Sequence, residues 1–169
     1  NLGVNPIEKL MDQLGEMALR LIITTLIISS LSDFKILRSL VEYRRMIGLF
    51  AFYYVCLHFL SYIILDHFFN LGFIIKDIIK RPFITFGFLS FIALIPLAAT
   101  STKATIKKLG HKTWKRIHYL IYPAAILSSF HFFMLVRANK IEPAIYISII
   151  FILLSYRIYI RALHPLLVR

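Results

Sequence analysis

Residues 114–136 read WKRIHYLIYPAAILSSFHFFMLV, and from residue 117 onward twenty consecutive positions carry no Lys, Arg, Asp or Glu. A helix rises about 1.5 Å per residue, so about 20 residues cross the roughly 30 Å hydrocarbon core of a bilayer. Only a helix satisfies its own backbone groups there without closing a barrel. We therefore predict a membrane-spanning helix that contains two histidines, His118 and His131.

Four other segments are similarly apolar, so we expect a single all-α domain over residues 1–169, a polytopic transmembrane helix bundle. The chain is 59% hydrophobic with a mean hydropathy of +0.77, above what a soluble domain of this length shows. Its net charge is +12, but the basic residues lie in short loops between apolar runs, which argues against nucleic-acid binding. The five expected helices cover about 14–31, 46–66, 83–100, 114–136 and 143–163.

Lysine and arginine are distributed unequally between the two sides of such a bundle. The loops 32–45 and 101–116 and the tail 157–169 carry 4, 6 and 3 of them. The opposite side carries 1, 3 and 2, in residues 1–16, 67–82 and 137–142. Because cytoplasmic loops are enriched in Lys and Arg, we place the first set in the cytoplasm. Segment 67–82 (HFFNLGFIIKDIIKRP) is amphipathic, and we expect it along the outer interface.

Three histidines, His58, His118 and His131, lie inside apolar segments, where an imidazole is unfavourable and marks a functional position. His58 and His131 fall at similar depth in the outer half, on different helices. Imidazole is a standard axial ligand of haem iron. We therefore predict that these two histidines bind one haem in a protein that transfers electrons. The alternative is that each histidine only packs between helices, bonded to a hydroxyl or a carbonyl.

His118 lies about 20 Å from His131 along the same helix, near the cytoplasmic end. At matching depth the second helix offers Arg44 or Arg45 in place of a histidine. Arginine is a poor iron ligand but binds a phosphate or a haem propionate well. The cytoplasmic half could therefore hold a second haem with an unusual ligand or a phosphate-bearing flavin.

Arg20 is a charged residue inside the first expected helix. It lies one turn from Glu16, and an i,i+4 ion pair near the outer interface is one explanation. The other explanation is that the guanidinium contacts a haem propionate, a partner that suits its paired donors.

Several motifs together resemble the YedZ/MsrQ family. Asn5-Pro6 and Ala18-Leu19-Arg20 match that family in character, and His131 falls where its third histidine does. The remaining motifs are RRMIGL (44–49), LHFLSY (57–62), RPFITFG (81–87), TST (100–102), KLG (108–110) and WKRIHY (114–119).

The resemblance implies more than the spacing does. The family belongs to the ferric-reductase-like transmembrane group and normally has six helices, of which the first would precede Asn1. Its members carry b-type haem, are reported to bind FMN, and lie in the bacterial inner membrane as multi-pass proteins. His58, His118 and His131 match the haem-associated histidines. Arg44 matches the arginine upstream of them and stands where related oxidases place a fourth histidine, so the resemblance implies one haem and leaves a second open.

The resemblance also implies partners. Electrons would come from the quinone pool or a cytoplasmic flavin reductase and pass to a periplasmic molybdopterin-containing reductase, which repairs methionine sulfoxide in oxidised proteins. The chain itself would be a non-catalytic electron-transfer subunit. Alternatives are a stand-alone membrane ferric reductase, a quinone-linked cytochrome b, or a non-redox transporter or assembly factor that would bind no haem.

Overall fold

The computed structural model describes residues 5–30 and 35–160 and is all α in those residues, as expected. Residues 1–4, 31–34 and 161–169 lie outside the described residues, and with them the ends of the first and last expected helices. The α-helices are α1 (Pro6–Ser30), α2 (Arg44–Ser61), α3 (Leu71–Lys80), α4 (Pro82–Ala99), α5 (Lys103–His118), α6 (Ile121–Leu135) and α7 (Ile141–Ile158). A 3-10 helix, η1 (Lys35–Glu42), precedes α2, and a short π-helix, η2 (Tyr62–Asp66), follows it.

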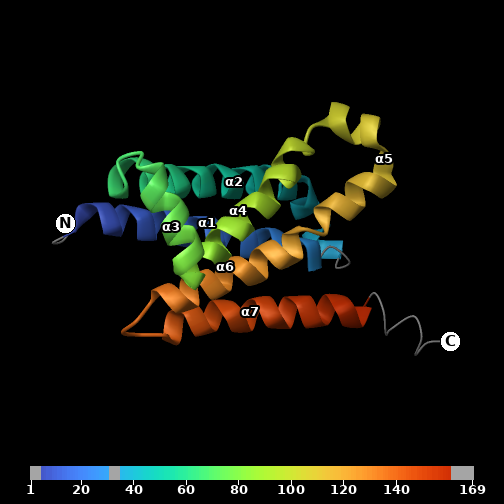
Figure 1. The fold of residues 1–169 in the computed structure, drawn as a ribbon. Coiled ribbons are helices and arrows are strands. Elements are labelled where there is room, and N and C mark those ends of the chain that lie inside the picture. Colours follow the sequence, from blue (N-terminus) through green and yellow to red (C-terminus); the bar gives the residue numbers. More distant parts are fainter. Residues whose placement is uncertain (1–4, 31–34, 161–169) are drawn as a thin grey trace.

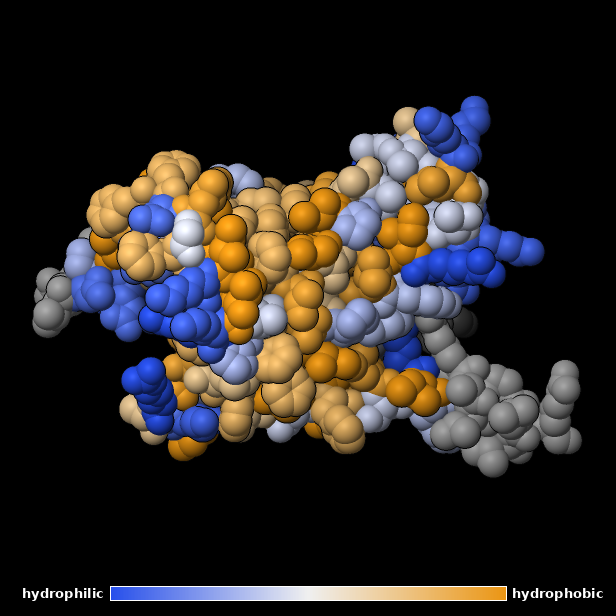
Figure 2. Space-filling view, viewed as in Figure 1, coloured by the Kyte–Doolittle hydropathy of each residue, from blue (hydrophilic) through white to orange (hydrophobic). Residues whose placement is uncertain are grey.

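Four helical stretches of the described residues are long and apolar enough to cross a membrane, against five expected. Their bounds are Arg44–Asp66, Pro82–Ala99, Lys103–Leu135 and Ile141–Ile158. Figure 2 shows a broad apolar band on the surface, with hydrophilic residues gathered towards its two ends. That pattern is typical of a protein whose sides contact lipid.

The first expected span falls on α1, which is not among these four. α1 begins at Pro6 rather than near residue 14, and it packs mainly against α2 and also contacts α6 and α7. More of its residues are buried than in any other described helix. Its buried apolar residues are Ala18, Leu19, Ile22, Ile23, Leu26 and Ile28.

The connections between helices gather at two ends of the bundle (Figure 1). The start of α1, α3 and the link between α6 and α7 lie at one end, which we call the outer end. η1, α5 and the end of α7 lie at the other, the inner end. These are the two sets of segments that the loop charges separate.

Within the stretch Lys103–Leu135, the expected helix at 114–136 is divided by a two-residue break at Tyr119 and Leu120, which separates α5 from α6. Pro123 explains the break. It has no N–H to donate to the carbonyl of Tyr119, and its ring clashes with that carbonyl in a continuous helix. In the first turn of α6, where no intrahelical donor is needed, the same proline is tolerated.

The expected loop at 101–116 is largely helical and forms α5. The Thr102 side chain caps the helix by accepting from the backbone N–H of Thr105 at 3.1 Å. Gly110 bends α5 with φ 75°, a positive φ that residues other than glycine rarely adopt.

The amphipathic segment at 67–82 forms α3 at the outer end. Asn70 caps it by accepting from the backbone N–H of Phe73 at 3.2 Å. Its apolar side chains are largely exposed, which fits the expected position along the membrane interface; they are Leu71, Phe73, Ile75 and Ile79.

We expect Ala124→Val to destabilise the bundle where α4 crosses α6. Ala124 has no exposed surface, and its carbonyl accepts from the Ser90 hydroxyl of α4 at 2.9 Å. Two extra methyl groups would force the helices apart, at about 1–3 kcal/mol of the free energy of unfolding. The thermal midpoint in detergent should fall, whereas Ala144→Val, at an exposed position of α7, should leave it nearly unchanged. Equal midpoints would contradict this packing.

Candidate functional site

His58 of α2 and His131 of α6 lie together in the outer half of the bundle. Their ring centroids are 6.1 Å apart and the ring planes make an angle of 76°. The separation agrees with the matched depth expected from the sequence.

The distance between these rings suits a single metal atom held between them. Two imidazoles on opposite sides of one metal have ring centres about 6 Å apart, because each metal–nitrogen bond is about 2.0 Å and each nitrogen lies about 1.1 Å from its ring centre. Within residues 5–30 and 35–160, no group of three or more His, Cys, Asp or Glu side chains could hold a metal ion. A metal between two imidazoles therefore needs further donors from a cofactor, such as the four nitrogens of a porphyrin.

Each imidazole is oriented by a backbone carbonyl of a neighbouring helix. Nδ1 of His58 lies 2.9 Å from the carbonyl oxygen of Met11 on α1. Nδ1 of His131 lies 2.6 Å from the carbonyl oxygen of Phe83 on α4. A carbonyl oxygen only accepts, so Nδ1 carries the proton in both rings and Nε2 keeps its lone pair for a metal. This is the usual outer-shell arrangement of a ligating histidine.

Met11 and Phe83 could not be found from the sequence. Their contribution comes from the main chain, so their residue types carry no signal. Only the packing of α1 on α2, and of α4 on α6, brings these carbonyls to the histidines.

His118 occupies a separate position at the inner end. Its Nε2 lies 3.2 Å from the hydroxyl oxygen of Thr100, and its ring centroid is 4.1 Å from that of Trp114. The indole N–H of Trp114 donates to the carbonyl of Thr100 at 3.1 Å. His118 is thus tied to the end of α4 rather than to His131.

Arg44 lies near His118, as the matched depth predicts. It opens α2, its Nη1 donates to the hydroxyl of Ser29 at 3.2 Å, and its positive charge acts on the His118 ring. The inner end therefore brings together a guanidinium, an imidazole and an indole.

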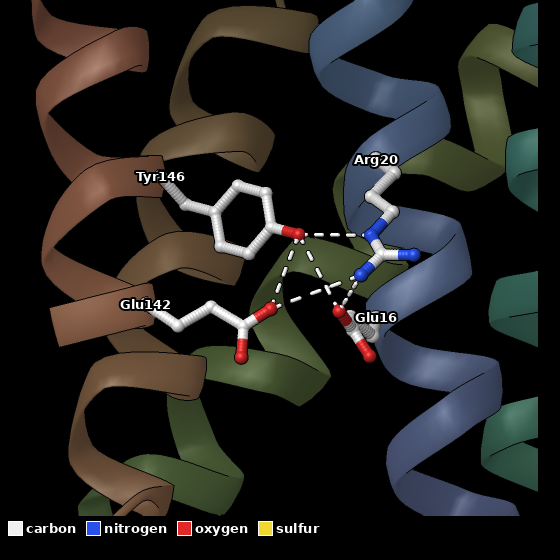
Figure 3. A network of polar contacts seen from close by, with 4 residues as sticks. All are labelled: Glu16, Arg20, Glu142 and Tyr146. Carbon is white, nitrogen blue, oxygen red and sulfur yellow. Dashed lines mark hydrogen bonds and ion pairs between the residues drawn. The ribbon is translucent and has the colours of Figure 1, made fainter. Parts of the chain in front are cut away.

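Arg20 joins α1 to α7 through a polar network (Figure 3). It pairs with Glu16, and its Nε donates to the Tyr146 hydroxyl at 2.8 Å. Glu142 lies 3.8 Å from Arg20 and 3.5 Å from the same hydroxyl. The expected i,i+4 ion pair is therefore present, and α7 supplies partners that local spacing did not indicate.

A groove of about 380 Å³ lies beside this network. Arg20 and Tyr54 form part of its wall. Tyr54 lies on α2, one helical turn before His58. The other lining residues are Leu10, Gln13, Leu14, Glu16 and Met17. Because these side chains come mainly from α1, the groove follows the outer half of that helix.

Residues 14–129 match a family described as "Ferric reductase like transmembrane component". The chain is also similar to proteins named "Protein-methionine-sulfoxide reductase heme-binding subunit MsrQ". It is 44% identical to that of Caulobacter vibrioides over 94% of this chain and 75% of the relative. For Rhodospirillum rubrum the identity is 44% over 94% and 76%, and for Brucella ovis it is 43% over 98% and 76%.

We expect Tyr146→Phe to weaken the attachment of α7 to α1. The change removes the hydroxyl that accepts from Arg20, at a cost of about 1 kcal/mol, as for other hydrogen bonds between membrane helices. The thermal midpoint in detergent should fall below that of the control Tyr156→Phe. Tyr156 lies on the same helix, and its hydroxyl makes no hydrogen bond within the part of the chain that the structure describes. Equal midpoints for the two variants would show that the network contributes little.

Proposed function

The chain belongs to the MsrQ family, within the ferric-reductase-like transmembrane components, and on that premise we propose that it is a haem-binding membrane subunit of a protein-methionine-sulfoxide reductase. In this role it transfers electrons and does not itself reduce methionine sulfoxide. The reduction belongs to a partner protein.

The pairing of His58 with His131 carries the proposal. Two imidazoles from different helices lie at the separation that one metal requires, and each has its Nδ1 proton directed to a carbonyl. We propose that their Nε2 atoms bind the iron of one b-type haem. A bound haem would supply one-electron oxidation and reduction. The carbonyls of Met11 and Phe83 would hold the rings in place and raise their basicity.

The position of the pair favours electron delivery towards the outer end. Met11 lies in the second turn of α1 and Phe83 in the first turn of α4, and both helices begin at that end. By the loop charges this end faces away from the cytoplasm. We propose that the membrane is the bacterial inner membrane, so that this end faces the periplasm. We propose that the acceptor there is the periplasmic molybdopterin-containing reductase.

The inner end suits receipt of electrons from the quinone pool or a cytoplasmic flavin reductase. His118 and Arg44 both lie at that end, close enough for the arginine charge to act on the imidazole, and arginine binds phosphate through paired donors. We propose that they hold FMN or a second haem.

We also propose Arg20 as a ligand for a carboxylate of the cofactor. In the contacts that the structure describes, Nε and Nη2 are engaged, and the side chain is 52% exposed. Nη1 points away from both glutamates in Figure 3, which leaves it able to donate to a propionate.

Replacement of either histidine tests the function. In purified protein we expect His58→Ala and His131→Ala each to lose low-spin b-type absorbance, because one axial ligand cannot hold the iron in a six-coordinate state. His111→Ala removes an exposed imidazole of α5 and should keep the spectrum. Full haem retention in both ligand variants would refute the assignment, and a wild-type protein without a Soret band would favour a non-redox membrane protein.

Removal of the arginine tests the inner end. We expect Arg44→Ala to lower FMN or inner-haem content per protein, because the phosphate or propionate loses its paired donors. Arg45→Ala removes the same charge from the neighbouring, exposed position and serves as the control. Cofactor extraction and visible spectra measure the loss. Unchanged flavin and haem content in Arg44→Ala would remove this role.

A further inference from the structure

Each of the paired histidines lies against a glycine. A Cβ atom added to Gly15 of α1 would lie 3.1 Å from Nδ1 and from Cε1 of His58. A Cβ atom added to Gly87 of α4 would lie 2.9 Å from Nδ1 and 3.0 Å from Cε1 of His131. At these distances an added Cβ atom and the imidazole could not both keep their present positions.

These glycines stand in the same relation to the carbonyls that bind the rings. Gly15 follows Met11 by four residues, and Gly87 follows Phe83 by four. In a helix the carbonyl of residue i already accepts from the N–H of residue i+4, and its second lone pair remains for another donor. The Cα–Cβ bond of residue i+4 leans towards that carbonyl. A side chain there would cover the oxygen that the imidazole needs.

We propose that Gly15 and Gly87 are positioning residues that set the planes of the two axial imidazoles. Each leaves room for one ring to reach the carbonyl one turn earlier, and the two contacts together hold the rings 76° apart. The inference rests on the proposed function, since it concerns how the haem ligands are held.

The contacts with the imidazoles distinguish Gly15 and Gly87 from another glycine inside a helix. Glycine is less favourable than alanine inside a helix, so a helical glycine with no close neighbour could be replaced by alanine without loss of stability. Gly48 of α2 is such a position, because an added Cβ would lie 3.7 Å from Cγ2 of Thr25, an ordinary contact. Gly48 therefore provides a control with the same substitution.

The orientation of the rings has a spectroscopic signature. Ferric haem with nearly perpendicular axial imidazoles gives a strongly anisotropic low-spin EPR signal, whereas nearly parallel rings give a rhombic one. We expect the strongly anisotropic signal from the wild-type protein and from Gly48→Ala. Gly15→Ala and Gly87→Ala should each convert it to a rhombic or high-spin signal and change the midpoint potential of the haem.

Added imidazole separates ring displacement from misfolding. If the new methyl group pushes a histidine off the iron, free imidazole should restore low-spin absorbance in the folded variant. An unfolded variant would not keep haem through purification, and the other glycine, on a different helix, then carries the test.

Unchanged EPR signals and potentials in both glycine variants would overturn the inference. That result leaves the proposed function intact provided that His58→Ala and His131→Ala still lose haem absorbance. Retained haem in the histidine variants would instead refute the ligand assignment itself.

Discussion

The contact between an imidazole N–H and a helix carbonyl organises the outer half of this protein. It occurs twice, between α1 and α2 and between α4 and α6, which are the two most extensive helix contacts of the bundle. In each case a main-chain oxygen of one helix accepts the Nδ1 proton of a histidine on the other helix of the pair. The Nε2 atom of that histidine therefore keeps its lone pair. The packing of the helix pairs and the chemistry of the site are therefore one constraint.

The two ends of the bundle differ in what they can hold. The outer end presents paired imidazoles, which suit a metal, and a half-exposed arginine at the edge of a groove. The inner end presents Arg44, His118 and Trp114, which suit an anionic or aromatic group. A route for electrons from the inner to the outer end would use both sets in turn, and this agrees with membership of a family whose relatives are named as heme-binding subunits.

Much of the fold could be predicted from hydropathy alone, because a membrane core admits only helices in segments this long. The differences between the predicted helices and the observed ones have physical causes. Pro123 divides an apolar run that reads as one helix. The lysine-rich segment before it is helical because Thr102 caps it, and Gly110 interrupts that helix with a bend. α1 extends well before its apolar stretch because Asn5 caps it, accepting from the backbone N–H of Glu8 at 3.3 Å, and because Pro6 suits a first helical position.

Residue type and a rise of about 1.5 Å per residue are enough to predict the all-α bundle, the sides on which its loops lie, and the matched depth of His58 and His131. Three features depend on how the helices pack and could not be predicted: the two rings meet, Met11 and Phe83 orient them, and α7 completes the network around Arg20. The reason is that main-chain oxygens are the same at every position and glycine has no side chain. Neither reveals a role until another helix packs against it.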